Sequence, residues 1–238
     1  VVKVGSSSIT GENQAKLDLV VDAIAASRAR GTEVALVTSG AIATGMPLLG
    51  ITEKPADLPT SQALASVGQS RLIARYQHSL ERHKLVAGQV LVTAGDLEHE
   101  ETRENARRAL DRLFELGVLP IVNENDTVAT QEIRFGDNDR LAALVAVLLD
   151  ADALILLSDV DGLYDKPPSQ ADAQRLGRIE FGQDLSSIEI GGVGTGVGTG
   201  GAVTKVTAAR VATESGISVL LTDTDSVQQA LAGEQLGT

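Results

Sequence analysis

Apolar and polar positions along the chain form blocks of two kinds, which predict strands and helices in alternation. Short apolar runs predict strands at residues 1–4, 33–37, 85–92, 118–122, 153–157 and 217–221. Apolar residues at helical spacing predict helices at residues 12–30, 61–81, 102–117, 141–149, 202–215 and 226–231. Strands that alternate with helices usually lie parallel in one sheet that is covered on both faces. We therefore predict an α/β fold, a three-layer α/β/α sandwich with a mostly parallel central sheet.

Two segments lack this regularity. Residues 47–59 contain Pro47, Pro55 and Pro59 and are predicted to form a loop or lid. The polar segment 165–190 shows no clear period and is predicted to hold a short hairpin. Because no shift in composition marks a linker, we expect residues 1–238 to form a single domain, as α/β chains of this length often do.

Polar side chains gather beside the apolar elements of the central stretch, residues 118–164. Carboxylates and amides cluster at residues 123–127, 134–140 and 158–164. Asn and Asp are common turn formers, so one such cluster alone would be equally typical of a capped loop. Three clusters that alternate with apolar elements favour a ligand site, because open α/β sheets bind ligands at the carboxyl ends of their strands.

The composition argues against several classes of protein. The net charge is −12, and no Lys- or Arg-rich run interleaves with aromatic residues, so we expect neither a nucleic-acid partner nor a membrane surface. The chain has no cysteine, which excludes disulfides and thiolate metal sites and fits a cytoplasmic location. No apolar run approaches the ~20 residues that span a bilayer. Aromatic residues are scarce, with no Trp, so the core is predicted to be aliphatic.

Small residues follow the first two predicted strands. Gly5 and the three serines after it follow the strand that carries Lys3, and small residues there let backbone N–H groups approach a ligand. At the end of the second strand, Gly40 stands beside Ser39. A hydrolase serine lies in a G-x-S-x-G frame, but Val37 occupies the first glycine position. Ser39 is therefore predicted to contact a substrate rather than to attack it.

A glycine-rich run at residues 191–201 allows two interpretations. Gly196, Gly198 and Gly201 satisfy G-x-G-x-x-G, with Asp223 at the end of the next strand, which is the pattern of a nicotinamide-dinucleotide-dependent dehydrogenase. The match is weak, because the preceding strand would be very short and the glycines extend beyond one tight turn. The other interpretation is a phosphate-binding loop, residues 199–205, that leads into a helix N-terminus with Lys205 in its first turn.

Several short motifs match one known family in the order in which that family has them. They lie at residues 2–6, 37–42, 65–72, 123–126, 135–139, 158–164 and 198–205. By these motifs the chain resembles the amino acid kinase family over essentially its whole length. The resemblance implies ATP-dependent phosphorylation of a carboxylate. Among possible acceptors, the matched motifs at Ser39 and at 123–126 favour the γ-carboxylate of L-glutamate. Its phosphorylation is the first step of proline biosynthesis.

The resemblance also implies a role for individual residues. Lys3 and Lys205 would contact the ATP phosphates and the transferring group, and Asp139 would hold the two lysines in place. The residues expected to bind glutamate are Ser39, Asp126 and Asn138. The residues expected to bind ATP are Lys3, Gly5, Ser158, Asp159, Thr199, Gly200, Gly201, Ala202, Val203, Thr204 and Lys205.

The chemistry of phosphoryl transfer is consistent with these residues. The reaction needs positioning and charge stabilisation, which two lysines and Mg²⁺ supply. A γ-carboxylate, with a pKa of about 4.3, is already ionised at neutral pH, so no general base is required. The three scattered histidines do not have metal-ligand spacing. We expect no metal site formed by side chains and a Mg²⁺ held mainly by the nucleotide phosphates.

Other functions stay open from the sequence. Kinases of acetylglutamate, aspartate, carbamate or uridylate would share the lysines and the glycine-rich loop, and a nucleotide-binding sensor without turnover would keep the same fold. The resemblance further implies a homodimer or homotetramer and proline as a feedback inhibitor. Many members of the family carry a C-terminal PUA domain. We expect none in this chain, and a single amino acid kinase domain at residues 1–238.

Overall fold

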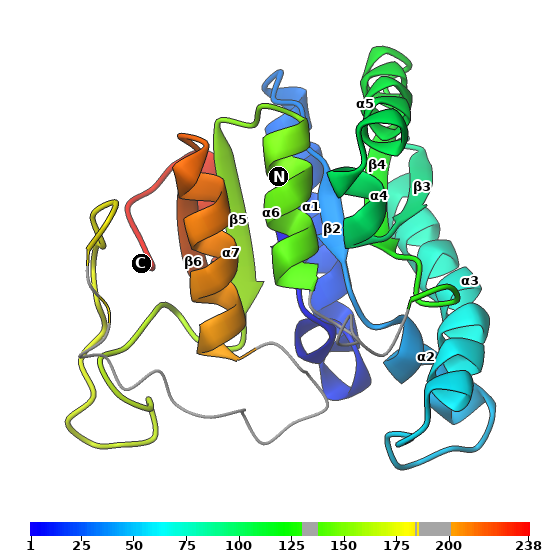
Figure 1. Ribbon diagram of the computed structural model, residues 1–238, viewed down its shortest axis with the longest axis horizontal. Coiled ribbons are helices and arrows are strands. Elements are labelled where there is room, and N and C mark those ends of the chain that lie inside the picture. The colour runs from blue at the N-terminus through cyan, green and yellow to red at the C-terminus, as the bar shows by residue number, and fades with distance from the viewer. Residues whose placement is uncertain (130–137, 184, 186–200) are drawn as a thin grey trace.

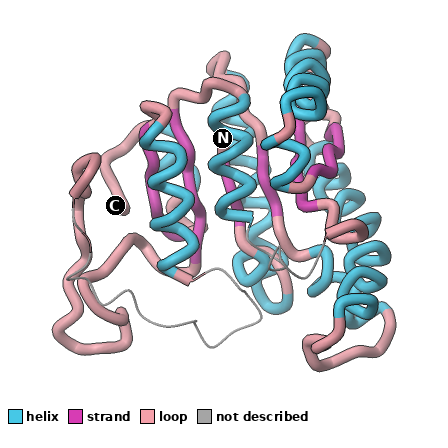
Figure 2. Tube along the Cα trace, in the orientation of Figure 1, coloured by secondary structure: helices cyan, strands magenta, loops and turns pink. Residues whose placement is uncertain are grey.

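The central sheet of the protein is parallel. The computed structural model describes residues 1–129, 138–183, 185 and 201–238. Within these ranges six strands form one sheet in the order β3-β4-β2-β1-β5-β6, and every neighbouring pair is parallel (Figures 1 and 2). The strands are β1 (Val2–Val4), β2 (Leu36–Thr38), β3 (Ala87–Val92), β4 (Leu119–Glu124), β5 (Ala153–Ser158) and β6 (Ser218–Asp223). The predicted parallel sheet is confirmed.

Helices cover both faces of this sheet. Two short 3-10 helices, η1 (Ser6–Ser8) and η2 (Gly11–Ala15), follow β1. The α-helices are α1 (Lys16–Ala29), α2 (Ala41–Leu48), α3 (Leu58–Glu81), α4 (Ala94–Glu98), α5 (Glu100–Glu115), α6 (Asn138–Leu148), α7 (Ala202–Glu214) and α8 (Val227–Ala232). In Figure 1, α6 and α7 lie in front of the sheet and α1 lies behind it. None of the described helices combines the length and the apolar character needed to cross a membrane.

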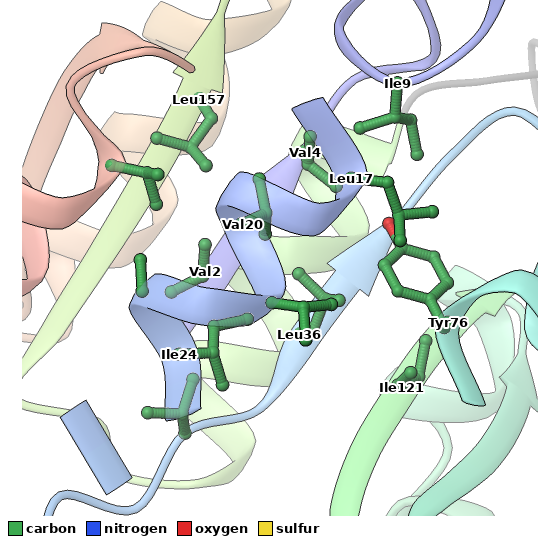
Figure 3. Close-up of a cluster of buried hydrophobic side chains, with 14 of the residues drawn as sticks. Val2, Val4, Ile9, Leu17, Val20, Ile24, Leu36, Tyr76, Ile121 and Leu157 are labelled. Carbon is green, nitrogen blue, oxygen red and sulfur yellow. The ribbon is translucent and has the colours of Figure 1, made fainter. Parts of the chain in front are cut away.

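Two aliphatic cores hold the three layers together. On one face, residues of β1 and β2 pack against α1, α3 and α8, with Val20, Ile24 and Leu36 fully buried (Figure 3). On the other face, α6 and α7 pack against β5 through residues such as Leu141 and Leu156. An aliphatic core was predicted from the scarcity of aromatic residues.

One aromatic side chain interrupts the first core. Tyr76 of α3 is fully buried, and its hydroxyl is hydrogen-bonded to the Thr38 hydroxyl at 2.8 Å (Figure 3). This bond satisfies the polar atom that the ring brings into the interior. It also ties α3 to the carboxyl end of β2.

The prediction of a continuous loop at residues 47–59 is wrong at both ends. Pro47 lies in the last turn of α2, a helix that was not predicted, and Pro59 lies in the first turn of α3. Proline is tolerated in a first turn because its missing N–H would have no intrahelical acceptor there. Asp57 caps the same turn by accepting a hydrogen bond from the Thr60 N–H at 2.9 Å.

Smaller differences concern short elements. Helix α4 was not predicted, because five residues are too few to show a helical period. It is defined by a capping box between Thr93 and Asp96. Strand β2 begins at Leu36, three residues later than expected. Of the predicted hairpin, the described residues contain one isolated antiparallel bridge, between Tyr164 and Arg175.

Helices α2 and α3 approach each other to backbone contact at two glycines. A Cβ atom on Gly68 would lie 1.8 Å from the carbonyl oxygen of Ala41, and one on Gly45 would lie 2.1 Å from the carbonyl oxygen of Leu64. Since the atoms in the way belong to the backbone, no side-chain rotation can relieve either clash. The two helices must separate to accept any larger residue.

Gly68→Ala is therefore expected to lower the free energy of unfolding by about 2–3 kcal/mol, in the upper range of overpacked cores. In a helix without a close neighbour, the same change would raise the free energy of unfolding by roughly 0.5–1 kcal/mol. The sign of the change therefore shows whether the two helices are in backbone contact. The measurement is urea denaturation beside Gly177→Ala, where a Cβ meets nothing within 4 Å. Equal stabilities of the two variants would contradict the close helix contact.

Candidate active site

The candidate residues meet at the carboxyl ends of the strands, the edge at which the arrowhead of β5 points downward in Figure 1. Lys3 lies on β1, and Ser39 follows β2 directly. Asp126 follows β4, and Ser158 ends β5. Helices α6 and α7 begin near the same edge and bring Asn138, Asp139 and Lys205 to it. The parallel sheet thus gathers groups that are far apart in the sequence.

Two lysines converge on one buried carboxylate. Lys3 Nζ lies 2.6 Å from Asp139 Oδ1, and Lys205 Nζ lies 3.4 Å from Asp139 Oδ2. The exposed fractions are 4% for Lys3, 7% for Lys205 and 1% for Asp139. The group carries two positive charges and one negative charge, so it holds an excess of positive charge in a site largely closed to water. Such a site favours an anionic ligand.

The charge states of this group depend on one another. Burial would raise the pKa of the Asp139 carboxyl, but the charges of Lys3 and Lys205 outweigh burial and lower this pKa to about 2. A hydrogen bond from the Thr204 hydroxyl, at 2.8 Å, acts in the same direction. Burial lowers the pKa of Lys205, and the attraction of Asp139 opposes this shift. Asp139 is therefore ionised at neutral pH and stabilises the positive charge of the lysines.

The N-terminus of α7 adjoins the lysine pair. Gly201 caps the helix, and its carbonyl oxygen accepts a hydrogen bond from the Thr204 hydroxyl at 2.9 Å. Ala202, Val203 and Thr204 form the first turn, where backbone N–H groups have no intrahelical acceptor. These N–H groups and the helix dipole favour an anion at this end. Two further predicted ATP-binding residues, Thr199 and Gly200, lie outside the described residues, as do Gly196 and Gly198 of the dinucleotide-like pattern.

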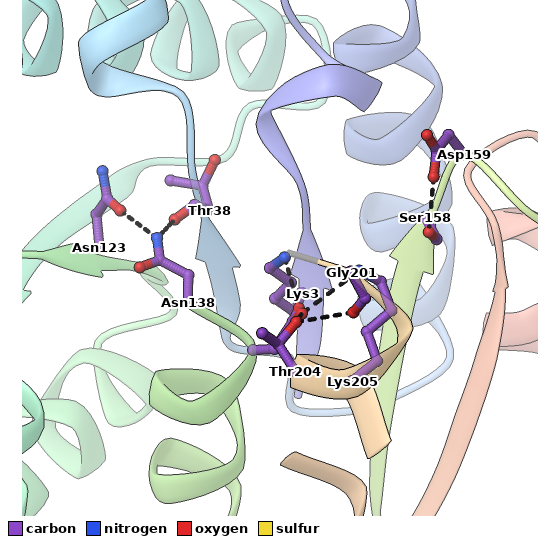
Figure 4. Close-up of polar contacts among 10 residues, drawn as sticks. Lys3, Thr38, Asn123, Asn138, Ser158, Asp159, Gly201, Thr204 and Lys205 are labelled. Carbon is purple, nitrogen blue, oxygen red and sulfur yellow. Dashed lines mark hydrogen bonds and ion pairs between the residues drawn. The ribbon is translucent and has the colours of Figure 1, made fainter. Parts of the chain in front are cut away.

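Other predicted ATP-binding residues lie at the ends of β5 and β1. Ser158 ends β5 and donates a hydrogen bond to Asp159 Oδ1 at 3.0 Å (Figure 4). The Ser158 carbonyl accepts hydrogen bonds from Thr224, which fixes the end of β5 against the segment after β6. Gly5 follows β1, and a Cβ atom there would lie 3.8 Å from Lys3 Nζ, an ordinary contact. The position of Gly5 thus fits a role beside Lys3 without a steric requirement for glycine.

A second group of polar side chains lies on the other side of the lysines, around Asn138. The Asn138 amide donates hydrogen bonds to the Thr38 carbonyl and, at 2.7 Å, to Asn123 Oδ1 (Figure 4). Asn123 in turn donates to Gln69 Oε1 at 2.6 Å. Within the described ranges, Asn138 Oδ1 is buried and has no hydrogen-bond partner. Burial of an acceptor without a partner costs free energy, and such an atom is typical of a site that binds a ligand.

The remaining predicted glutamate-binding residues are also buried. The Ser39 hydroxyl has no hydrogen-bond partner in the part of the chain that the structure describes. Asp126 is 9% exposed, and burial raises the pKa of its carboxyl from 3.8 to about 6. Close to neutral pH Asp126 is thus an ionised carboxylate with a substantial desolvation penalty. A ligand cation would relieve this penalty.

Sequence reasoning gave no role to four residues of this hydrogen-bonded group: Thr38, Gln69, Tyr76 and Asn123. Thr38, Gln69 and Asn123 fall within matched motifs, but a motif does not reveal which side chains touch. Gln69 and Tyr76 lie on α3, and helical spacing alone gave no sign that they reach the strand ends. Their contacts depend on how α3 packs on the sheet.

The described residues offer no ready-made metal site. Among residues 1–129, 138–183, 185 and 201–238, no group of three or more His, Asp or Glu side chains is placed to hold a metal ion. In this part of the molecule the charged groups near the lysines are arranged for ion pairing, with Asp139 engaged by Lys3 and Thr204.

Comparison with known proteins gives consistent results. The model of the amino acid kinase family matches residues 1–223. Glutamate 5-kinase of Clavibacter sepedonicus is 65% identical over 238 residues, covering 100% of this chain and 92% of the relative. Glutamate 5-kinase of Leifsonia xyli subsp. xyli is 60% identical over 239 residues, covering 100% of this chain and 88% of the relative.

Solved structures agree on the fold at much lower identity. Isopentenyl phosphate kinase has a TM-score of 0.70 at 20% identity, covering 100% of this chain and 97% of the other. Carbamate kinase from Giardia lamblia bound to AMP-PNP has a TM-score of 0.69 at 15% identity, covering 99% of this chain and 95% of the other. The fold, the full-length relatives and the family model lead to one conclusion: the chain belongs to the amino acid kinase family.

Proposed function

We propose that this protein transfers the γ-phosphoryl group of ATP to the γ-carboxylate of L-glutamate, which yields L-glutamyl 5-phosphate and ADP. This is the glutamate 5-kinase reaction, the first step of proline biosynthesis. The observation that carries the proposal is the pair of buried lysines on Asp139, beside the buried Asn138 Oδ1 and Ser39 hydroxyl, which have no hydrogen-bond partner among the described residues. The names of relatives that are 60% and 65% identical support glutamate as the acceptor.

The reaction makes one bond and breaks one. An oxygen of the γ-carboxylate forms a bond to the γ-phosphorus, and the bond from that phosphorus to the bridging β,γ-oxygen breaks, so ADP leaves with the electron pair. No proton must be removed, because the acceptor is already ionised. Negative charge moves from the carboxylate toward the bridging oxygen as the transfer proceeds. Lys3 and Lys205 would stabilise that charge, and their burial strengthens the effect.

The group around Asn138 suits the amino acid end of glutamate. Ionised Asp126 and the Asn138 Oδ1 acceptor would bind the α-ammonium group, and the Ser39 hydroxyl would donate to a carboxylate oxygen. These contacts would leave the γ-carboxylate directed toward the lysines. Binding both ends of the substrate fixes the orientation that in-line transfer requires.

The nucleotide would bind on the opposite side of the lysines. The first turn of α7 would receive its phosphates, with Ser158 and Asp159 beside them. Mg²⁺ bound to the phosphates would neutralise part of their charge, and we assign it mainly nucleotide ligands. Thr199 and Gly200 are proposed nucleotide contacts from the sequence motif.

The family resemblance supports several wider proposals. We propose a single kinase domain at residues 1–238, a homodimer or homotetramer, and feedback inhibition by proline. The absence of cysteine supports a cytoplasmic location.

A hydroxylamine-trapping assay with ATP and Mg²⁺ tests the proposed reaction, because an acyl phosphate is captured as its hydroxamate. We expect hydroxamate with L-glutamate and only background with N-acetylglutamate or aspartate, since the relatives point to free glutamate. Omission of ATP is the control for direct reaction of the acid. Signal only with another acid would keep the chemistry and overturn the substrate, and no signal with any of them would overturn carboxylate phosphorylation.

A further inference from the structure

The amide groups beside the lysines form a chain that starts on helix α3. Gln69 Oε1 accepts a hydrogen bond from Asn123 Nδ2 at 2.6 Å, and Asn123 Oδ1 accepts one from Asn138 Nδ2 at 2.7 Å. Asn123 and Asn138 are 1% and 2% exposed, whereas Gln69 is half-buried. The chain thus connects a helix on one face of the sheet with the first residue of α6, which lies over the other face.

Backbone groups fix the direction of the two asparagine amides in this chain. The Glu124 N–H donates to Asn123 Oδ1 at 2.9 Å, so the oxygen of Asn123 must lie on that side. The Thr38 carbonyl can only accept, so the atom of Asn138 that faces it must be Nδ2. Asn138 then has both amide hydrogens engaged, and its Oδ1 is left as a buried acceptor without a partner among the described residues.

Gln69 stands at the α3 end of this chain, and only its side-chain oxygen can face the Asn123 amide nitrogen. The Asn123 NH₂ group is a donor, so Gln69 must present Oε1 to it. Without that acceptor, Asn123 would keep a buried donor without a partner. Rotation of the Asn123 amide would relieve this cost, but it would withdraw Oδ1 from Glu124 and Asn138. The Asn138 amide would then lose its hydrogen bond to Asn123 Oδ1, which helps to fix its orientation.

We propose that Gln69 is a positioning residue for the amino acid substrate: through Asn123, it holds the Asn138 amide with Oδ1 directed as an acceptor for the substrate ammonium group. The inference rests on the proposed function and extends it to a residue of α3. Gln69 need not touch the substrate, because its effect passes through two amides whose directions are set by the backbone.

The test compares two substitutions at one position. Gln69→Leu removes the acceptor, whereas Gln69→Glu keeps an oxygen that can accept from Asn123. We expect Gln69→Leu to raise the glutamate KM by about tenfold, the effect of one buried donor left without a partner. The KM for ATP and kcat should stay within about threefold of wild type. Gln69→Glu should restore the glutamate KM to within about threefold, which a merely structural role of the side chain's volume would not predict.

Gln77→Leu is a matched control on the same helix. Gln77 Oε1 accepts from the Ala87 N–H at 2.9 Å, so this variant also loses a hydrogen bond from α3, but at the amino end of β3, remote from the site. It should lower the melting temperature without changing the glutamate KM. Side-chain amide resonances in NMR spectra of the ligand-free protein add a second measurement: those of Asn138 should shift in Gln69→Leu and not in Gln77→Leu.

The outcomes separate this inference from the proposed function. An active wild-type enzyme with an unchanged glutamate KM in Gln69→Leu would overturn the role of Gln69 alone. An equal rise of KM in Gln69→Leu and Gln69→Glu would also overturn it, because the acceptor would then not matter. A wild-type protein that forms no hydroxamate from L-glutamate would overturn the proposed function and, with it, the substrate role of this chain of amides.

Discussion

Lys205→Ala is expected to lower kcat by about 10²–10³-fold, the usual effect of removing one preorganised group that stabilises charge in a transition state. The charge moves within a site where both lysines are less than one-tenth exposed, so water cannot replace the missing ammonium group efficiently. The KM for glutamate should change little, because the residues assigned to the amino acid lie on the other side of the lysines. The rate of hydroxamate formation at saturating substrates measures the effect.

The fold should tolerate this substitution. Asp139 keeps its ion pair with Lys3 at 2.6 Å and its hydrogen bond from Thr204 at 2.8 Å, so no buried carboxylate is left without a partner. Lys16→Ala is a matched control, because Lys16 pairs with Asp225 at 2.7 Å on the surface, where ion pairs contribute little. A near-wild-type kcat in folded Lys205→Ala would remove Lys205 from the mechanism.

The layers of the fold could be predicted because they depend on the hydrophobic pattern. In β4, β5 and α6 the fold buries most of the apolar residues of the sequence pattern. The alternation of strands and helices implied a parallel sheet. Helix α2 could not be predicted in this way, because its stability depends on a partner. It packs on α3 through Gly45 and Gly68, and two single glycines 23 positions apart in the sequence carry no periodic signal.

The candidate site was predictable in its place and residue types, but not in its contacts. Polar clusters after apolar strands indicated the edge of the sheet. The meeting of Lys3, Asp139 and Lys205 could be expected only from the family resemblance, since the three come from distant parts of the chain. The amide directions at Asn123 and Asn138 depend on the backbone groups that face them, which no motif specifies. The motifs therefore predict which residues take part, whereas the packing of the elements decides which side chains touch.

A pH profile of kcat/KM for glutamate is expected to fall below pH 6, by up to tenfold for each unit. The reason is Asp126, whose pKa burial raises to about 6 and whose ionised form is proposed to bind the substrate ammonium group. The γ-carboxylate of glutamate, with a pKa of about 4.3, stays ionised over most of this range. Asp126→Asn should abolish this limb of the profile. It should also raise the glutamate KM by about 30-fold or more, as loss of one partner of a buried charge pair does, and leave the KM for ATP nearly unchanged.

The same shift predicts the opposite effect on stability. The folded protein binds the Asp126 proton more tightly than the unfolded chain, so this group destabilises the fold above pH 6, and the penalty disappears as the pH falls toward 4. At pH 7 the penalty is about 3 kcal/mol from the two pKa values. Asp126→Asn should therefore be more stable than wild type at pH 7, and the two proteins should converge near pH 4 in urea denaturation. A variant that is less stable than wild type at pH 7 would show that burial does not destabilise the ionised Asp126 carboxylate. A variant that keeps the wild-type pH profile of kcat/KM would show that Asp126 is not the group that binds the ammonium.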